Sequence, residues 1–399
     1  MKSGTFKSDI SGTFVSDTSG TFGVIYSINT ENNRLSSNQS HITRKMKHIY
    51  IFIISFILLS TSCSKREKDF PDSIFSTTLE LSQSDFNIEE KDLAQIEGIH
   101  CNDSVLIVLD FHSGDSYTLF DINSGKIIRR FGAIGQGPNE IPLGTYGYIE
   151  DKYFYLFYDP IGYIGKYSID SLCNTKSISH PHRLAKYQLE ETQLSRAISL
   201  NDSIFLGAGT YKSKFQYTLF NKYNNILDYG IEIYNSNSKD FNKYHKFLSN
   251  QGNLKKRPNR NQFVYSLNFS SNLDIVEINN NKIHLIKSLH FANPNYQPVS
   301  NDNLNRVIPS KENIIGYLDI CATKEYIYAL YADKKRFTDN KSNNYNSDTI
   351  LVFDWNGNPI RKLKLTNEAY YICINEDRQM LYAAVKDASY GWSIISYKL

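Results

Sequence analysis

Residues 98–110 read GIHCNDSVLIVLD: a short apolar segment, a polar turn, and a second segment rich in β-forming residues. Asn, Asp and Ser favour turns while Val and Ile favour strands, so this stretch predicts an antiparallel hairpin. The pattern recurs in four further segments, which read GYIEDKYFYLFYD, AISLNDSIFLGAG, LDICATKEYIYALYAD and YICINEDRQMLYAAVKD. A hairpin that recurs along a chain indicates a repeat architecture.

A second kind of hairpin follows most of these copies. It reads YTLFDINSGKIIRRF, IGKYSIDSLCNTKSI, YTLFNKYNNILDYGI and ILVFDWNGNPIRKLKL in turn. A weaker unit, VYSLNFSSNLDIVEINNNKIHLIKSLHF, fits between the third and fourth strong copies. Each unit is predicted to be a four-stranded antiparallel meander, and six units fill the length. Because such units bury their faces only by stacking on neighbours, the prediction is an all-β fold, a six-bladed β-propeller.

The last unit stops one strand short of a full meander. An isolated strand-like segment, SIFSTTLEL at Ser73–Leu81, precedes the first blade and could supply the missing outer strand. Pairing the first strand with the last removes an open sheet edge. The propeller is therefore predicted to occupy residues 73–399 and to be closed by this N-terminal strand; a β-sandwich would not explain both the repeat and the split final unit.

An export signal is predicted over residues 46–62. Two basic positions precede an apolar run at Ile49–Leu59, which is shorter than the roughly twenty residues that span a bilayer. The small residues Ser60-Thr61-Ser62 and then Cys63 resemble a bacterial lipobox, although Ser60 stands where such boxes usually have Leu. The resemblance implies that Cys63 is lipidated and becomes the mature N-terminus, with residues 63–72 as a tether. The alternative is a short buried strand that ends in a core cysteine.

Residues 1–45 contain the tetrad SGTF three times and then a polar stretch. Since export signals act from the extreme N-terminus, this segment is predicted to be an over-extended start or a disordered leader. The alternative is a small additional β-unit.

The motif RRFGAIGQGPNEIP at Arg129–Pro142 follows the first blade. Together with the export signal and the hairpin repeat, it resembles the TolB-like six-bladed propeller lipoproteins of Bacteroides-type bacteria. The resemblance implies an envelope location and a binding role, and it brings no catalytic residues. Glycines and prolines suit a rigid crossover between two blades. Alternatively, the exposed amides of the motif hold a ligand.

Loops after the second and fourth strands of a meander emerge at the same end of the ring. We expect them to form a ligand site, because convergent loops on a rigid scaffold are the usual place for one. The residues concerned are Asp110, His112, Gln136, Asn139, Glu140, Asp159, Asp333 and Asp387. In the alternative interpretation each aspartate hydrogen-bonds its own turn.

Enzyme signatures are mostly absent from the sequence. It has no G-x-S-x-G, H-E-x-x-H or calcium-loop motif, so no catalytic residue, metal or cofactor is expected. One comparison favours an enzyme: IEGIHC, with Glu97, is similar to the opening blade of gluconolactonase-type hydrolases, whose E-G segment supplies a metal ligand. The corresponding late segment here, INEDRQMLYAA, lacks the acidic turn of that family. Two functions stay open: ligand binding, or a metal-dependent lactone or ester hydrolase.

Charge and location limit the partners. The net charge is +3, and export excludes nucleic acid. The expected partner is a peptide, a glycan or an envelope protein, with the lipid anchor in the outer membrane and the propeller periplasmic or surface-exposed. The one dense basic run, LKKRPNR at Leu254–Arg260, could touch anionic lipid or glycan but is predicted to be a solvated loop. No disulfide is expected, because Cys101, Cys321 and Cys373 fall on the first strands of different blades.

Overall fold

The structure is a computed structural model that describes most of residues 72–399. The gaps are 89–91, 113, 136, 138, 143–144, 159–161, 175, 177–179, 190–191, 193, 210–213, 234–249, 292–293, 295, 299–306, 311–312, 336, 339–340, 343–344 and 388–390. The predicted leader, the signal peptide, Cys63 and nearly all of the tether lie outside the described residues, as do Gln136 and Asp159.

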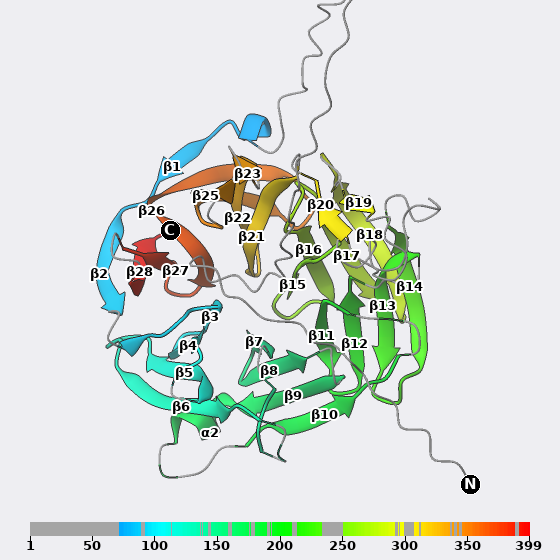
Figure 1. The fold of residues 1–399 in the computed structure, drawn as a ribbon, viewed down its shortest axis with the longest axis horizontal. Helices are drawn as coiled ribbons and strands as arrows, with labels where there is room; N and C mark the ends of the chain where they lie inside the picture. The colour runs from blue at the N-terminus through cyan, green and yellow to red at the C-terminus, as the bar shows by residue number, and fades with distance from the viewer. Residues whose placement is uncertain are drawn as a thin grey trace, which may run out of the picture. The chain divides into compact units, whose positions relative to one another are not determined.

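Four-stranded antiparallel sheets form blades 1 to 4, and each runs in chain order from an inner to an outer strand around a central axis (Figure 1). Blade 1 contains β3 (Gly98–Cys101), β4 (Val105–Leu109), β5 (Asp115–Asp121) and β6 (Ile127–Ala133). Blade 2 contains β7 (Tyr146–Glu150), β8 (Tyr153–Tyr158), β9 (Tyr163–Ser168) and β10 (His182–Lys186). Blade 3 contains β11 (Arg196–Asn201), β12 (Ile204–Ala208), β13 (Phe215–Asn221) and β14 (Ile226–Glu232). Blade 4 contains β15 (Gly252–Lys256), β16 (Gln262–Leu267), β17 (Leu273–Asn279) and β18 (Lys282–Leu289).

Blades 5 and 6 share one long strand. The strands of this continuous sheet are β21 (Ile314–Ala322), β22 (Tyr326–Lys335), β25 (Ser347–Asp354), β26 (Pro359–Asn375), β27 (Met380–Lys386) and β28 (Trp392–Lys398). The first half of β26 pairs with β25 as the outer strand of blade 5, and from Ala369 onward it pairs with β27 as the inner strand of blade 6. The predicted six-bladed all-β propeller is therefore confirmed.

An N-terminal strand closes the ring, as predicted, but it is not the segment that the sequence favoured. The outer strand of blade 6 is β2 (Gln83–Ile88), which pairs antiparallel with β28. The predicted segment Ser73–Leu81 instead contains β1 (Thr78–Glu80), which runs parallel to β26 at the edge of blade 5. Leu81, which directly follows β1, is buried in the core of blades 5 and 6. The segment Ser73–Leu81 therefore covers the outer edge of blade 5, next to the closing strand β2.

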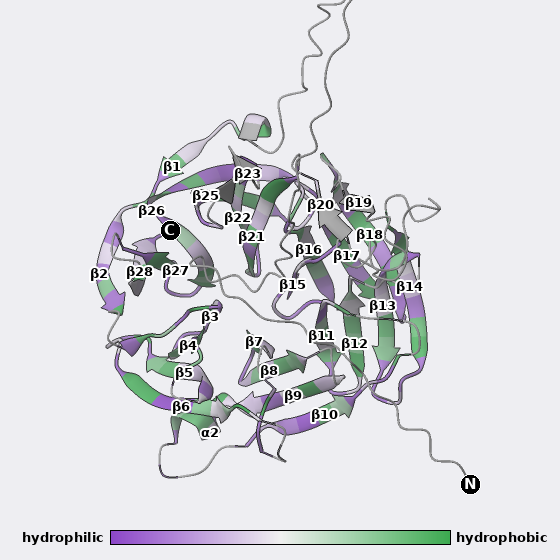
Figure 2. Ribbon diagram, viewed as in Figure 1, coloured by the Kyte–Doolittle hydropathy of each residue, from purple (hydrophilic) through white to green (hydrophobic). Residues whose placement is uncertain are grey.

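Hydrophobic residues concentrate in the middle strands of the blades (Figure 2). They form clusters between neighbouring blades; for example, the ring of Tyr117 on β5 packs edge-on against Phe154 on β8, with centroids 4.9 Å apart. Gly147 on β7 is needed for this packing, because a Cβ there would lie 2.2 Å from the Phe154 ring. Each fully buried ring contributes about 1.5–3 kcal/mol of hydrophobic stabilisation, so the blades hold the ring together through their faces.

Short elements decorate the blades. A five-residue helix, α2 (Ile169–Cys173), stands between β9 and β10, where the sequence predicted a plain hairpin. Ser168 caps it, since its Oγ accepts a hydrogen bond from the amide of Ser171. The remaining elements are η1 (Asp72–Ile74), β19 (Tyr296–Pro298) paired with β20 (Val307–Pro309), and β23 (Phe337–Thr338) paired with β24 (Lys341–Ser342). In the described part of the chain, no helix is long and apolar enough to cross a membrane.

The interpretation of Leu254–Arg260 as a solvated loop is wrong. Leu254, Lys255 and Lys256 belong to β15, the inner strand of blade 4, and Leu254 is fully buried. Only the following residues, Arg257 to Arg260, turn toward β16. The two lysines make this strand resemble a loop in the sequence. An inner strand of a propeller can carry charged residues, because one of its sides faces the axial channel.

Candidate functional site

The axial channel contains the larger of two described cavities, with a volume of about 200 Å³. All six inner strands contribute to its wall. The lining comprises Ile99–Cys101, Tyr148–Asp151, Ile198, Lys255–Pro258, Ile320–Thr323, Ile372–Ile374 and Glu376. Most of these residues lie in the second half of an inner strand or in the turn after it, so the cavity opens where the inner strands end. Its volume far exceeds the roughly 10–15 Å³ that one water requires.

Lys255 brings a positive charge into this cavity. Its ammonium lies 5.4 Å from the ring centroid of Tyr146, and the guanidinium of Arg196 lies 4.6 Å from the same ring. Such contacts stabilise a cation by about 0.5–2 kcal/mol, more when it is desolvated. Burial by itself would lower the pKa of Lys255, but Tyr146 and Asp319 favour the charged form and hold this pKa above its ordinary value.

Asp319 on β21 interacts electrostatically with Lys255. Its carboxylate accepts hydrogen bonds from the amides of Ile320 at 2.8 Å and Ile372 at 3.0 Å. Burial raises the pKa of Asp319, while Lys255, the two amides and Arg196 act in the other direction. The second of these hydrogen bonds joins the inner strands of blades 5 and 6 at the channel.

His100 on β3 also lines the cavity. Only 8% of this residue is exposed, and its Nε2 has no hydrogen-bond partner among the described residues. Burial lowers the pKa of His100 well below its ordinary value, and the charge of Lys255 adds to the effect. The ring is therefore neutral at pH 7, with an unused polar nitrogen in the wall of the channel.

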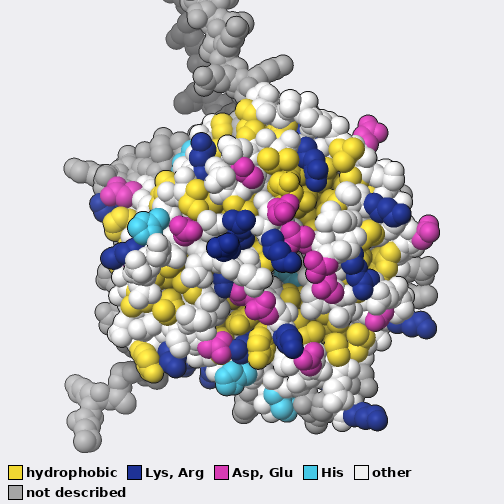
Figure 3. Space-filling model, turned by 180° about the vertical axis from the view of Figure 1, so that it is seen from behind, with side chains coloured by type: hydrophobic (Ala, Val, Ile, Leu, Met, Phe, Trp, Pro, Cys, Tyr) yellow, Lys and Arg dark blue, Asp and Glu magenta, His cyan; other side chains and the backbone are white. Residues whose placement is uncertain are grey.

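Charged residues surround the open end of the cavity. Lys256 forms an ion pair with Glu150, and both side chains are mostly buried, at 10% and 19% exposure. Arg257 donates from Nε to the carbonyl of Lys324 at 2.7 Å and lies 5.4 Å from the ring of Trp355. Figure 3 shows one face of the ring with basic and acidic side chains gathered around its centre. Lys256 and Arg257 thus have a carboxylate or a carbonyl partner at the rim, whereas no ion pair is formed by Lys255 among the described residues.

Glu97 lies at the other end of the channel, directly before β3. It accepts hydrogen bonds from Gln95 Nε2 at 2.6 Å and from the hydroxyl of Tyr371 at 3.3 Å. Burial raises its pKa to about 7, although these two donors and Lys386 oppose the shift. Glu97 is therefore a carboxyl group that is partly protonated near neutral pH.

Three thiols stand on neighbouring inner strands, as the sequence predicted. Cys101, Cys321 and Cys373 are free, and so is the exposed Cys173 on α2. The side chain of Cys101 lies beside that of Cys373, and burial raises the pKa of Cys321 to about 12 and that of Cys373 well above its ordinary value. Cys321 and Cys373 are therefore protonated and unreactive at neutral pH.

Asp110 follows β4 and so lies near the start of β3, away from the open end of the cavity. It is fully buried and accepts a hydrogen bond from Thr118 Oγ1 at 3.0 Å. Burial raises its pKa to about 6, although the hydrogen bond and the charge of Arg130 oppose this shift. His112 is half-buried in the next turn, where its carbonyl accepts from the amide of Asp115.

The glycine motif joins β6 to β7, which agrees with its predicted place between two blades. Asn139 and Glu140 are exposed, and Glu140 Oε2 accepts a hydrogen bond from the amide of Gly137 at 2.7 Å. A Cβ on Gly135 would lie 1.8 Å from this carboxylate oxygen, so a larger residue there would displace the exposed Glu140 side chain from this position. The carboxylate thus stabilises its own loop.

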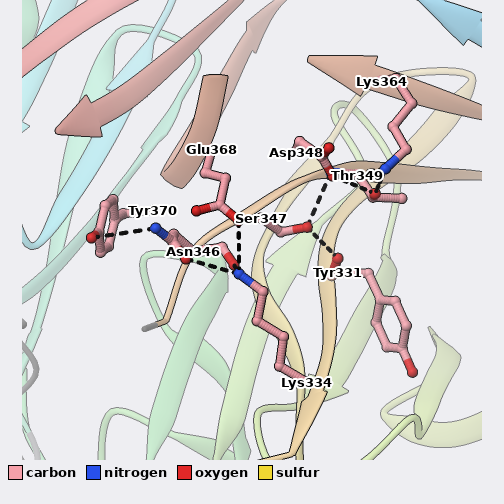
Figure 4. A network of polar contacts seen from close by, with 9 residues as sticks. All are labelled: Tyr331, Lys334, Asn346, Ser347, Asp348, Thr349, Lys364, Glu368 and Tyr370. Carbon is pink, nitrogen blue, oxygen red and sulfur yellow. Dashed lines mark hydrogen bonds and ion pairs between the residues drawn. The ribbon is translucent and has the colours of Figure 1, made fainter. Parts of the chain in front are cut away.

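The two remaining aspartates lie near blades 5 and 6. Asp387 Oδ1 accepts from the amide of Gly391 at 2.9 Å, and Asp333 Oδ1 accepts from the hydroxyl of Tyr331 at 3.4 Å. Next to Asp333, Lys334 donates to Asn346 and to Glu368 at 2.9 Å, and the hydroxyl of Tyr370 continues this network (Figure 4). These contacts are those of residues that stabilise their own loops, and convergence of the aspartates on a ligand stays a prediction.

A cluster that resembles a hydrolytic triad lies between blades 3 and 4. His290 Nε2 is 2.8 Å from both Ser288 Oγ and Asp274 Oδ1, and Ser288 also donates directly to Asp274. In a catalytic triad the two ring nitrogens contact different partners. Here one nitrogen faces both, so this cluster cannot pass a proton from the serine through the imidazole. The cavity beside it measures only about 20 Å³.

A metal centre also finds no support in the described part of the molecule. No group of three His, Cys, Asp or Glu side chains there could hold a metal ion. Glu97, the residue similar to a metal ligand of the gluconolactonase type, is instead hydrogen-bonded by Gln95 and Tyr371. The described donor set does not fit such a metal.

A family model described as TolB-like 6-blade propeller-like matches residues 97–377. The chain belongs to this TolB-like family. The match runs from Glu97 into blade 6 and confirms the resemblance inferred from the glycine motif and the hairpin repeat. No curated protein matched the chain.

Solved structures with a similar fold come from several bacteria. A protein described as exported, from Bacteroides fragilis, is 15% identical, covers 80% of this chain and 98% of its own, and has a TM-score of 0.47. A member of the DUF4221 family from Bacteroides vulgatus is 11% identical, with 80% and 97% coverage and a TM-score of 0.49. A gluconolactonase from Xanthomonas campestris is 10% identical, with 78% and 89% coverage and a TM-score of 0.42. At these identities the likeness concerns the fold alone.

Sequence reasoning missed Arg196, Lys255 and Asp319. All three stand on inner strands. The one usable signal in the sequence is a charged residue inside a predicted first strand, as in LDICA for Asp319, and it does not tell which other residues lie beside that charge.

Proposed function

We propose that this TolB-like propeller is a lipid-anchored protein of the bacterial cell envelope that binds a ligand in its axial channel without catalysis. The ligand is a group small enough to enter the channel, carried by a peptide, a glycan or a partner protein. The observation that carries the proposal is the cavity of about 200 Å³ with Lys255 and the unpartnered Nε2 of His100 in its wall. Convergent polar groups in a concave, partly apolar site are typical of ligand binding.

The envelope location is supported by the signal-like segment 46–62 and by Cys63 directly after it. Replacing Cys63 by Ser should move the protein from the outer-membrane fraction to the soluble periplasmic fraction. Cys173→Ser is the matched control, because this cysteine is exposed on α2 and should leave the distribution unchanged. Mass spectrometry of the purified protein should find a lipid on Cys63; an unlipidated chain that still contains residues 1–45 would refute the anchor.

Channel binding is tested by closing the cavity. Ala322 is half-buried in its wall, so Ala322→Trp should fill the opening. Native mass spectrometry of protein purified from envelopes should reveal a bound ligand on the wild type and none on this variant. Circular dichroism and the melting temperature would verify that both proteins are folded.

The end of the ring that carries the loops after the second and fourth strands is the second candidate surface for the same function. Replacing Gln136, Asn139 and Glu140 together by Ala should leave the bound ligand in place if the channel holds it. Loss of the ligand from this triple variant, with retention by Ala322→Trp, would transfer the site to the loops.

The hydrolase alternative makes a different prediction. A tightly bound divalent ion after purification, together with hydrolysis of a lactone that Glu97→Gln abolishes, would favour the enzyme. Binding without turnover and without stoichiometric metal would support the proposal.

A further inference from the structure

We propose that a single carboxylate group of the ligand binds at the inner end of the channel cavity, beside His100 and Lys255 in its wall. Tyr146, Arg196 and Asp319, which lie next to Lys255 or to one another, complete the site. These five residues are named the channel cluster. The inference rests on the proposed function, because it names the chemistry by which the channel recognises its ligand.

The first observation is an excess of positive charge. Arg196 and Lys255 approach the same ring, that of Tyr146, at 4.6 and 5.4 Å. Among the described residues, no carboxylate oxygen lies within ion-pair distance of either cation. Asp319 acts electrostatically on both from further away. Two cations and one carboxylate leave the channel cluster with one uncompensated positive charge.

The second observation is a set of three buried polar atoms that have no hydrogen-bond partner in the described structure. They are His100 Nε2, Tyr146 Oη and Arg196 Nε. The guanidinium always donates, and the neutral imidazole can carry its proton on Nε2. A buried polar group without its hydrogen bond carries a desolvation cost. An oxygen acceptor in the channel would remove this cost, whereas a cationic ligand would add to the excess charge.

The charge balance selects a monoanion. One negative charge neutralises the excess, while a dianion such as a phosphate monoester would place a surplus negative charge near Asp319. A carboxylate also suits the planar guanidinium, which can donate two parallel hydrogen bonds to it. Beyond the cluster, the cavity wall combines apolar residues such as Ile198 and Ile320 with charged residues near the opening, so the remainder of the ligand would meet a mixed surface.

Two sources provide such a carboxylate at the end of a small group. One is the C-terminus of a peptide, and the other is an acidic sugar such as a uronic acid. Both share the same recognition chemistry, and they differ in the group to which the carboxylate is attached. N-acetylalanine and glucuronate represent the two sources in solution.

The experiment is isothermal titration calorimetry with matched pairs of probes on the full mature chain. N-acetylalanine or glucuronate should bind, at least tenfold more tightly than the neutral partners N-acetylalanine amide and glucose. Lys255→Met and Arg196→Met should each weaken the binding acid at least tenfold. Lys255→Arg keeps the charge and should remain within about threefold of the wild type. Lys222→Met removes an exposed lysine of blade 3 and should change nothing.

The outcomes separate this inference from the proposed function. Equal binding of acid and amide, or equal binding by folded Lys255→Met and Lys222→Met, would overturn the carboxylate site. A ligand on the envelope-purified wild type, lost on Ala322→Trp, with no affinity for either acid would also overturn it while supporting the channel. Preference for one acid over the other identifies the source and supports the site.

Discussion

Replacement of Ile88 by Ala tests which N-terminal segment closes the ring. Ile88 is the last residue of β2; it is 2% exposed and pairs with Ile394 on β28. The substitution removes three carbons, worth about 2.4 kcal/mol at about 0.8 kcal/mol each. The cavity left behind adds to this, so we expect a loss of about 3 kcal/mol in the free energy of unfolding.

The matched control is Leu79→Ala on β1, which also removes three carbons. Leu79 is 44% exposed, so its truncation creates no buried cavity and should lower the free energy of unfolding by about 1 kcal/mol or less. Urea titration followed by tryptophan fluorescence measures both values. For a folded region of this size, 3 kcal/mol corresponds to a fall in melting temperature of about 4 °C. If Leu79→Ala cost as much as Ile88→Ala, β1 would be the closing strand and the pairing of β2 with β28 would be wrong.

Three further predictions concern buried charges. Glu97→Gln should flatten the pH dependence of the free energy of unfolding between about pH 4.5 and 7. A carboxyl group with a folded pKa of about 7 stabilises the protein less and less as the pH rises through this window. An unchanged slope in urea titrations at several pH values would contradict this prediction. Glu150→Gln should cost about 2–4 kcal/mol in the same assay, since it leaves Lys256 buried without its partner, whereas Glu232→Gln, at an exposed pair with Lys214, should cost less than about 1 kcal/mol. The pKa of His290 is raised, because the effect of Asp274 outweighs that of burial, which opposes the shift. The contribution of His290 to the free energy of unfolding is therefore present below about pH 6.5 and is lost as the pH rises through the folded pKa. Asp274→Asn should abolish this loss, and NMR titration of the imidazole would report it.

The repeat could be predicted because five hairpins alternate apolar and polar residues around recognisable turns. Blade 4 was only partly recognised, since its inner strand reads GNLKK and its two lysines resemble a loop. Closure was assigned to SIFSTTLEL rather than QSDFNI, because apolar content favours the former. In the structure QSDFNI pairs with β28 instead. Which segment reaches β28 in register depends on the tertiary structure and cannot be read from either segment alone.

The candidate site was less predictable than the fold. Glu97 could be identified from the segment IEGIHC, and the structure gives it a buried position and a raised pKa. Lys255, Arg196 and Tyr146 come from three blades, and their proximity depends on how inner strands are arranged around the axis. Asp110 and Asp387 directly follow the second strands of their blades, as alternation predicted, whereas Asp333 lies within β22. The sequence could not predict whether the side chain of Asp110 points inward or outward, and in the structure it is fully buried.

The uninterrupted strand β26 has a mechanical consequence. It leaves blade 5 as an outer strand and enters blade 6 as an inner strand without an intervening loop (Figure 1). The hydrogen bond from the amide of Ile372 to Asp319 fixes the same two blades to each other beside the channel. A ring of this construction cannot widen between blades 5 and 6 without breaking a β-ladder. Admission of a larger ligand must therefore be accommodated at the other blade junctions, so amides of blades 5 and 6 should exchange with solvent more slowly than those of blades 2 to 4.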